Sequence, residues 1–505
     1  MTFQHLLDGA EVLAQSGDPT VNGVEYDSRR VKPGCVFVAM HGETSDGNRF
    51  IDQAIQSGAV AVVTDSSSEK PREGVAWAVV PHGRRALARL SANFYKRPAE
   101  RLAIIGITGT NGKSTTAFLI ESILTAAERK SALIGTIEYH VAGRVYPAPH
   151  TTPEALELAR LLDEAVGNGV SDAVMEVSSH ALAQERVFGV PFDVAVFTNL
   201  TRDHLDFHKN MDDYFAAKKR LFEGCGTDAP RAVVTNLDDE YGAKLVDFSR
   251  KRSSLVLTYG WNRGDFHAAN VDITPRGTRF DLIAEQEKIA IFSPLIGRVN
   301  VYNILAAAAA CHARGCSPTA IAAGVEALTH VPGRFQRVDC GQPFTVVVDY
   351  AHTDDALRNL TALAREFVSR SGNSGRVLTL FGCGGDRDRA KRPLMGEAAG
   401  RGSDFVVLTS DNPRSEDPRA IINDALVGLQ KTGVKYTVEV DRRKAIALVI
   451  REARPGDIVL LAGKGHEKTQ TTRDGAHPFD DVEVAREALS AAGFECAPAA
   501  TGQQA

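Results

Sequence analysis

The chain has 505 residues, of which 43% are hydrophobic and 24% charged, and its formal net charge is −5. This composition is ordinary for a soluble globular enzyme, and the length predicts about three domains. The acidic balance, without long blocks of like charge, disfavours nucleic acid as a partner. The N-terminus lacks the pattern of a signal peptide, and the most apolar stretch, 304–311, is too short to span a membrane. We therefore expect a cytoplasmic protein that binds neither nucleic acid nor membranes.

Seven cysteines are scattered along the chain, and none forms a C-x-x-C pair. A zinc ribbon or a thioredoxin-type redox site is therefore disfavoured. Reduced thiols are the expectation for a cytoplasmic chain of this kind.

Residues 1–98 mix short strand patterns with turns and end at Lys96-Arg97-Pro98. Because the residue before a proline is driven out of helical space, this tripeptide is a plausible linker. The block is predicted to be a smaller N-terminal α/β domain. Arg84 and Arg85 within it are expected to lie on a solvated helix face.

Residues 99–331 alternate buried-strand patterns with segments of helical length. The runs 102–107, 172–177, 193–199 and 231–236 each contain a mainly apolar stretch. Such runs, separated by helices, predict a mostly parallel sheet covered on both faces.

A glycine-rich loop, 106–115, follows the first of these runs and precedes a helix-like stretch. A strand, a glycine-rich turn, Lys113, Ser114 and a helix form the context of a phosphate-binding loop. Lys113 would reach the β and γ phosphates, and Ser114 could hold Mg²⁺. The usual spacing would place a glycine at 107, where this chain has Ile107. The motif predicts that the chain binds a nucleoside triphosphate; the alternative is a chance glycine-rich turn.

Two later strands of this block end in ionisable side chains. Glu176 closes the run 172–177, where it could bind Mg²⁺ or instead cap the next helix. His204 and His208 follow the run 193–199 with a spacing that would place them on one face of a helix, as in metal sites. The alternative for this pair is surface histidines in a loop.

Residues 332–505 begin at a second boundary, Pro332-Gly333, and repeat the alternation. The predicted strands 344–349, 376–381, 404–409 and 457–462 are each followed by a polar motif. Parallel strands would bring these motifs to one edge of the sheet, where open α/β sheets bind ligands. Arg414 offers a planar guanidinium that suits a carboxylate, and Glu467 could pair with an ammonium. The two side chains predict a site for a zwitterionic amino acid, unless they simply pair with each other.

Nine short motifs together resemble those of the Mur ligases along nearly the full chain. Among these ligases the closest resemblance is to the members that add the third residue of the peptidoglycan stem peptide. The matching segments are 108–114, 151–153, 176–180, 199–208, 300–303, 332–335, 349–352, 411–414 and 463–467.

The resemblance implies an α/β protein of three domains. These are a UDP-sugar-binding domain over 1–98, a central P-loop parallel-sheet ATPase domain over 99–331 and a Rossmann-like amino-acid-binding domain over 332–505. It also implies an ATP-dependent ligation of meso-2,6-diaminopimelate to the D-Glu γ-carboxylate of UDP-MurNAc-L-Ala-D-Glu through an acyl phosphate. ATP is a co-substrate, two Mg²⁺ ions assist, and a monomer is expected.

The resemblance also assigns roles to individual residues. The catalytic group is Lys113, Glu176, His204 and Lys218. Mg²⁺ ligands are Ser114, Glu176, His204 and, if carbamylated, Lys218, which by itself would be read as a solvated helix residue. ATP contacts are Gly109, Thr110, Asn111, Gly112, Lys113, Ser114, Thr115, Asn303, Arg334, Asp349 and His352. The UDP-sugar-peptide contacts are Ser28, Thr151, Thr152, Ser178, Gln184 and Arg186. The diaminopimelate contacts are Arg387, Asp411, Asn412, Pro413, Arg414, Gly463 and Glu467.

The chain departs from the family pattern at one position, because Asp354 stands where a proline is usual. We expect a looser turn near ATP and no loss of a ligand. The alternatives are another ligase of the superfamily (lysine-adding, D-Ala-D-Ala-adding or folylpolyglutamate synthetase) and a P-loop ATPase without ligase chemistry. The Asp411-Asn-Pro-Arg414 segment favours the diaminopimelate enzyme, because the distal carboxylate of diaminopimelate, which lysine lacks, would face Arg414.

Overall fold

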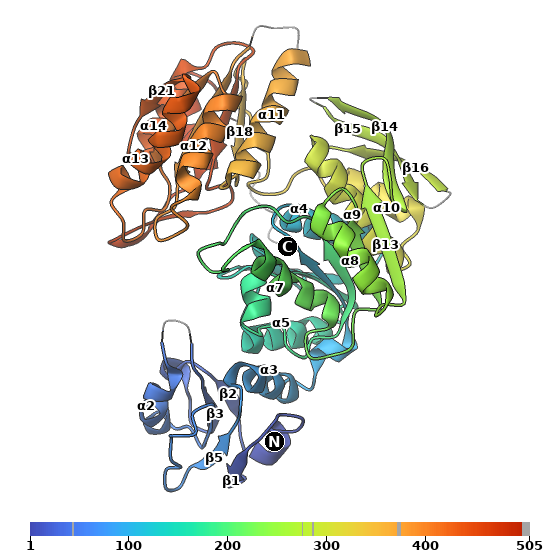
Figure 1. The fold of residues 1–505 in the computed structure, drawn as a ribbon, viewed down its shortest axis with the longest axis vertical. Coiled ribbons are helices and arrows are strands. Elements are labelled where there is room, and N and C mark those ends of the chain that lie inside the picture. The colour runs from blue at the N-terminus through green and yellow to red at the C-terminus, as the bar shows by residue number, and fades with distance from the viewer. Residues whose placement is uncertain (43–44, 275, 285–286, 371–374, 497–505) are drawn as a thin grey trace.

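A computed structural model describes residues 1–42, 45–274, 276–284, 287–370 and 375–496. The described chain forms an elongated molecule with three lobes, in chain order along its long axis (Figure 1). Each lobe is built on its own sheet, and helices cover the sheets. The predicted α/β class is confirmed.

The N-terminal sheet has five strands in the order β1-β5-β4-β3-β2, and only β1 runs antiparallel to its neighbour. Helix α3 (Gly83–Phe94) packs on one face, and a cluster around Phe37 and Trp77 fills the other. The remaining elements are α1 (Phe3–Leu6), β1 (Ala14–Ser16), β2 (Gly23–Glu25), β3 (Cys35–Ala39), α2 (Ile51–Gln56), β4 (Ala61–Thr64) and β5 (Ala76–Val79).

The central sheet contains eleven strands among the described residues, in the order β16-β15-β14-β13-β12-β11-β6-β10-β7-β8-β9. Its middle six strands are parallel, and all four predicted runs are strands of that part. These six are β6 (Ala103–Thr108), β7 (Ser131–Ile134), β10 (Asp172–Glu176), β11 (Phe192–Phe197), β12 (Ala232–Asn236) and β13 (Leu255–Gly260). The predicted parallel arrangement is confirmed for this middle part.

Five further strands extend the central sheet on both sides, and the sequence did not predict them. They are β8 (Glu138–Val141), β9 (Arg144–Pro147), β14 (Phe266–Thr274), β15 (Gly277–Ala284) and β16 (Glu287–Ser293). β14 pairs parallel with β13, and the other pairings of these strands are antiparallel. Buried residues alternate with more exposed ones along β15 and β16, so no continuous apolar run marks them.

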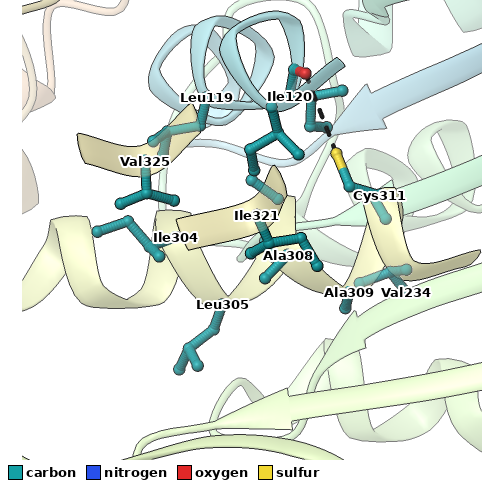
Figure 2. Close-up of a cluster of buried hydrophobic side chains, with 14 of the residues drawn as sticks. Leu119, Ile120, Val234, Ile304, Leu305, Ala308, Ala309, Cys311, Ile321 and Val325 are labelled. Atoms are coloured by element: carbon teal, nitrogen blue, oxygen red, sulfur yellow. Dashed lines mark hydrogen bonds between the residues drawn. The ribbon is translucent and has the colours of Figure 1, made fainter. Parts of the chain in front are cut away.

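The helices of the central lobe include α9 (Arg298–Ala313), which is buried along almost its whole length. Its small alanines allow close packing against the P-loop helix α4 (Lys113–Ala126) and against α10 (Pro318–Ala327) (Figure 2). Ala308 and Ile304 meet Ile120 and Val325 in this cluster. The packing fixes α4 and therefore the loop at its N-terminus. The other helices are α5 (Ala155–Gly167), α6 (Ser179–Ala183), α7 (Met211–Glu223) and α8 (Glu240–Arg250).

The C-terminal sheet has the order β17-β18-β22-β19-β20-β21, and all strands except β17 are parallel. The four predicted strands are four adjacent members, so their polar loops do meet at one edge. The strands are β17 (Gln336–Val338), β18 (Thr345–Asp349), β19 (Val377–Cys383), β20 (Phe405–Ser410), β21 (Lys435–Val438) and β22 (Ile458–Ala462). A small hairpin, β23 (Thr469–Thr472) and β24 (Gly475–Pro478), follows β22. The helices are α11 (Asp354–Arg370), α12 (Lys391–Gly402), α13 (Pro418–Leu429), α14 (Arg442–Glu452) and α15 (Asp481–Ala491).

The expectation that all cysteines are reduced is wrong for one pair, because Cys340 and Cys496 form a disulfide. The two residues are 156 positions apart, so their spacing gave no hint. They meet because the segment after α15 packs on the β17 side of the C-terminal core, where Phe494 contacts Phe344. The other five cysteines are free thiols.

Candidate functional site

The phosphate loop connects β6 to α4, as predicted, and its glycines are sterically required. A Cβ atom on Gly109 would lie 1.9 Å from Thr198 Oγ1, and one on Gly112 would lie 2.4 Å from Asn303 Oδ1. Both glycines also have positive φ angles, 148° and 87°. The second contact brings Asn303, from α9, against the loop where the prediction placed it.

Lys113 begins α4 and folds back over the loop. Its Nζ donates to the carbonyl oxygens of Gly109 at 3.1 Å and Thr110 at 2.9 Å. Burial lowers the pKa of the Lys113 ammonium. Its side chain therefore lies inside the loop, where phosphate oxygens could replace the carbonyls as acceptors.

Glu176 ends β10 and is 1% exposed. Its Oε1 accepts from the Thr136 backbone N–H at 2.8 Å, and its Oε2 accepts from the Thr136 hydroxyl at 2.9 Å. The capping alternative is wrong, because the Ser178 hydroxyl caps α6 by accepting from Ala181 N–H. Thr136 lies in a turn after β7 and was missed, since nothing in the sequence places that turn beside Glu176.

Lys218, on α7, is 1% exposed, so its reading as a solvated helix residue is wrong. Its Nζ donates to Gly109 O at 2.8 Å and lies 4.6 Å from the centroid of the Tyr214 ring. Burial and the nearby Lys113 ammonium lower the pKa of Lys218 well below its ordinary value. Two lysines from different helices therefore converge on one carbonyl of the phosphate loop.

His204 and His208 lie in a turn between β11 and α7, so the described residues 204–208 do not form the expected helix. His204 has a positive φ of 55°, and the turn is closed by a bond from His208 N–H to His204 O. His208 is buried against the Ser179 hydroxyl, whereas the His204 side chain remains 41% exposed. Only His204 is thus open to a ligand, and it is the one assigned to the metal.

Side chains of the C-terminal lobe reach the phosphate loop. Arg334 donates to the Ser114 hydroxyl at 3.3 Å and its guanidinium lies over the Tyr350 ring. Asp349 holds this segment by accepting from Phe335 N–H at 2.7 Å, and burial raises the pKa of its carboxyl. Of the ATP residues assigned to the C-terminal lobe, Arg334 therefore touches the loop directly.

Four further pairs join the two lobes beside the loop. Asn111 donates to Asp355 at 3.1 Å, which the prediction did not anticipate. Asp203 lies 3.7 Å from Lys391 Nζ and 3.8 Å from His352 Nε2. Arg202 and Asp388 form the fourth pair, at 3.5 Å.

The residues assigned to the sugar-dipeptide cluster around α6. Arg186 donates to Thr152 O at 3.0 Å and to Gln184 Oε1 at 2.7 Å. The Thr152 hydroxyl accepts from Ser178 N–H at 3.0 Å. The Thr151 hydroxyl lies 3.1 Å from the Thr136 hydroxyl, which donates to Glu176, and this contact links the cluster to Glu176.

Ser28 lies apart from that cluster, in the N-terminal lobe, where its hydroxyl donates to Gln53. The lobe itself docks on the central one through ion pairs. Arg84 pairs with Glu154 at 3.3 Å, and Arg85 pairs with Glu185 at 3.0 Å. The expected solvated face is wrong for Arg84, whose side chain is 19% exposed, because the sequence could not reveal an acid 70 residues away. Arg85 remains 48% exposed, as expected, although it pairs with an acid 100 residues away.

Two loops, after β20 and β22, form the candidate amino-acid pocket. Asn412 Nδ2 donates to Glu467 Oε2 at 2.7 Å. A Cβ atom on Gly463 would lie 2.7 Å from Asp411 Oδ2, so the loops touch where only glycine fits. Burial raises the pKa of Asp411. These four residues therefore meet as the sequence predicted.

Arg414 has a positive φ of 52° and lies opposite the loop after β19. Its guanidinium donates to Gly385 O at 2.7 Å rather than pairing with Glu467, so that alternative is wrong. The same loop carries Arg387, which is exposed and donates to Asp386 O. Pro413 brings the loops into contact, since its carbonyl oxygen would lie 1.9 Å from a Cβ on Gly385.

The β23–β24 hairpin covers the 411–414 loop and was not predicted. Gln470 donates to Asp411 O at 2.6 Å, and Thr471 N–H donates to Asn412 Oδ1 at 2.9 Å. Arg414 N–H in turn donates to Thr471 O at 3.0 Å. Three of the four residues 469–472 are threonines, and this short segment is the one feature of the sequence that favours a strand here.

Three family models match the chain. They are the Mur ligase family catalytic domain at 20–95, the Mur ligase middle domain at 107–311 and the Mur ligase glutamate ligase domain at 333–465. A protein of Solibacter usitatus named UDP-N-acetylmuramoyl-L-alanyl-D-glutamate--2,6-diaminopimelate ligase is 55% identical over 486 residues, 96% of each chain. A protein of Geobacter metallireducens with the same name is 45% identical, over 92% of this chain and 93% of its own.

A solved structure of a ligase with this name is 35% identical, with a TM-score of 0.67 over 98% of this chain and 99% of that one. Fold, site and relatives together define a ligase. The chain belongs to the Mur ligase family.

Proposed function

We propose that this protein joins meso-2,6-diaminopimelate to the γ-carboxylate of the D-Glu residue in UDP-MurNAc-L-Ala-D-Glu, with hydrolysis of ATP to ADP and phosphate. The observation that carries the proposal is the 55% identity, over 96% of both chains, to a ligase named for this reaction. The 411–414 loop, with Arg414 opposite Gly385, supports diaminopimelate as the amino acid.

In the proposed reaction the D-Glu carboxylate attacks the γ phosphorus of ATP, and ADP leaves. The product is an acyl phosphate, whose carbonyl carbon is then attacked by an amine of diaminopimelate. Loss of phosphate and of one proton gives the amide. Two anions must approach in the first step, so the loop N–H groups and Lys113 would offset their repulsion and hold the transferred charge.

Mg²⁺ fits the donors at this site, because the Glu176 carboxylate and the Ser114 hydroxyl are hard oxygen ligands. No group of three or more His, Cys, Asp or Glu side chains in the described part of the chain is placed to hold a metal ion. We infer that Ser114, Glu176 and His204 would share Mg²⁺ with the phosphates. The ion would supply charge neutralisation on the triphosphate.

We further propose that Lys218 carries a carbamate and holds a second Mg²⁺. The depressed pKa of its amine supports this, since a neutral amine is the form that adds CO₂. Thr151, Thr152, Ser178, Gln184 and Arg186 would bind the dipeptide end of the sugar substrate, and Ser28 its uridine end. ATP would also contact Asn303, Arg334, Asp349 and His352.

The amino acid would lie between the loops after β19, β20 and β22. The proposal gives the distal carboxylate to Arg414 and Arg387 and an ammonium to Glu467, with Asn412, Asp411, Pro413 and Gly463 completing the pocket. Leaving a desolvated guanidinium without its carboxylate partner, as lysine would, costs several kcal/mol, about 3–5. That is enough to select diaminopimelate over lysine.

We propose the limits 1–98, 99–331 and 332–505 for the three functional domains, and a cytoplasmic monomer. No helix among the described residues is long and apolar enough to cross a membrane.

The test measures phosphate release from ATP with each co-substrate omitted in turn. Turnover should require UDP-MurNAc-L-Ala-D-Glu and diaminopimelate together. Replacement of diaminopimelate by lysine or by D-Ala-D-Ala should reduce kcat/KM by at least about 100-fold. Preference for either replacement would contradict the proposal, and so would hydrolysis that needs neither co-substrate.

A further inference from the structure

Lys464 is a fully buried cation between the two loops of the amino-acid pocket. Its side chain is 0% exposed, and its Nζ donates to Glu467 Oε2 at 2.8 Å. The same nitrogen donates to Asn412 Oδ1 at 3.2 Å and lies 3.9 Å from Asp411 Oδ1. One ammonium group therefore contacts both loops.

These bonds determine how the polar groups of the pocket are oriented. Asn412 Oδ1 faces Lys464, so its Nδ2 points the other way and donates to Glu467 Oε2 at 2.7 Å. Both donors reach the same carboxylate oxygen, which leaves Oε1, on a side chain 27% exposed, for a ligand. Thr471 N–H also donates to Asn412 Oδ1 at 2.9 Å and holds that amide. Without the ammonium, the Glu467 carboxylate would lose one of its two donors and could rotate.

A second buried cation holds the strand ends beneath these loops. Arg442 donates to Ala462 O at 3.0 Å and to Ser410 O at 3.4 Å, the residues just before Gly463 and Asp411. Its charge is balanced by Asp481, which is also 0% exposed. The strand ends are therefore fixed independently, and the orientation of the Glu467 carboxylate above them depends on Lys464.

We propose that Lys464 is a positioning residue for the incoming amino acid, which together with Asn412 orients Glu467 for the substrate ammonium without contacting the substrate itself. This role rests on the proposed function. It adds a determinant of amino-acid affinity outside the residues that would touch diaminopimelate.

The test compares Lys464→Met, which keeps a long unbranched side chain and removes its charge, with the unchanged protein. The KM for diaminopimelate should rise about 10- to 100-fold, because a misplaced pocket group costs this much. The KM values for ATP and UDP-MurNAc-L-Ala-D-Glu should stay within about twofold. A uniform rise in all three, or an unchanged KM for diaminopimelate, would overturn the proposal.

A double-mutant cycle identifies the residue through which Lys464 acts. If Lys464 works through Glu467, Lys464→Met/Glu467→Gln should have nearly the same KM for diaminopimelate as Glu467→Gln alone. The double variant removes one cation and one anion together, so it remains informative if Lys464→Met fails to fold. A further loss of tenfold or more in the double variant would contradict positioning through Glu467.

Arg376→Met is the matched control, because Arg376 pairs with Asp457 at 2.8 Å at the other end of β19 and β22. It should lower stability and leave the KM for diaminopimelate within about twofold. If the unchanged protein fails to ligate diaminopimelate, the proposed function is wrong. If it ligates and Lys464→Met behaves like Arg376→Met, the positioning role alone is wrong.

Discussion

The phosphate loop and the amino-acid pocket both contain buried lysines, but the lysines have different hydrogen-bond partners in the two sites. Lys113 and Lys218 donate to backbone carbonyls of the phosphate loop, and burial lowers the pKa of each. Lys464 instead donates to the Glu467 carboxylate beside Asp411. The phosphate loop therefore holds positive charge that a triphosphate would balance, whereas the pocket is balanced before any ligand arrives.

This contrast indicates what each site needs from its ligand. An anionic ligand would gain from the poorly compensated ammonium group of Lys113. A zwitterionic ligand gains more from donors and acceptors whose positions are already fixed. The central and C-terminal lobes meet beside the phosphate loop, where Arg334 contacts Ser114 and Asp355 contacts Asn111.

The largest effect is expected for Lys113→Met, which removes the Lys113 ammonium group from the phosphate loop. We expect kcat to fall by about 1000-fold, in the range found when a donor to developing charge is lost. Phosphate release under saturating substrates measures it. Lys219→Met, on the same helix as Lys218, is the control and should stay near the original rate. A loss below tenfold would show that the loop does not depend on this charge.

The next effect is expected for Arg414→Ala. Loss of a desolvated guanidinium partner should lower kcat/KM for diaminopimelate by about 100- to 1000-fold, while ATP binding changes little. Steady-state kinetics with each substrate varied in turn gives both values. Arg419→Ala, an exposed arginine at the start of α13, is the control. Equal losses for diaminopimelate and ATP would contradict the assigned role.

The sequence predicted the parallel strands and the loops at their ends because apolar runs and glycines are local signals. Distant partners left no such signal. Thr136 beside Glu176, Lys464 beneath Asn412 and the β23–β24 hairpin over the pocket all depend on tertiary contacts. The spacing of His204 and His208 predicted a helix for a related reason, because spacing does not reveal backbone conformation. His204 has a left-handed conformation, and the segment forms a turn. Chemistry-bearing residues were thus easier to predict than the residues that orient them.

Stability should separate the two kinds of lysine. Lys464→Met leaves the Glu467 and Asp411 carboxylates without their cation, and we expect a loss of about 2–3 kcal/mol in the free energy of unfolding. Lys113→Met replaces a poorly compensated buried charge by an apolar chain and should cost less than about 1 kcal/mol, or stabilise. Denaturant titration of both variants measures the difference. Equal losses would contradict the contrast between the sites.

A smaller effect concerns pH. Burial lowers the pKa of Lys218, so between its folded and unfolded pKa values the unfolded chain binds more protons and stability rises with pH. Lys218→Met removes this contribution, so its free energy of unfolding should rise less between pH 7 and about 9.5. The measurement is a denaturant series in CO₂-free buffer, which keeps the amine free. Parallel curves for the two proteins would show an unperturbed lysine.

The smallest effect is expected where the C-terminal lobe meets the phosphate loop, for Asp354→Pro. Asp354 is the first residue of α11, where its N–H has no partner within the helix, and the Thr353 hydroxyl caps the helix by accepting from Ala356. Proline should therefore fit at this position. In the unchanged protein, the Asp354 carboxylate lies at the helix N-terminus and pairs with Arg358, and this stabilisation offsets the looser turn that we expect without proline. We expect stability to change by less than about 1 kcal/mol. Thermal unfolding and kcat measure this, with Arg358→Ala reporting the lost ion pair alone. A large fall in kcat with unchanged stability would show that Asp354 affects the neighbouring Asp355–Asn111 contact between the lobes.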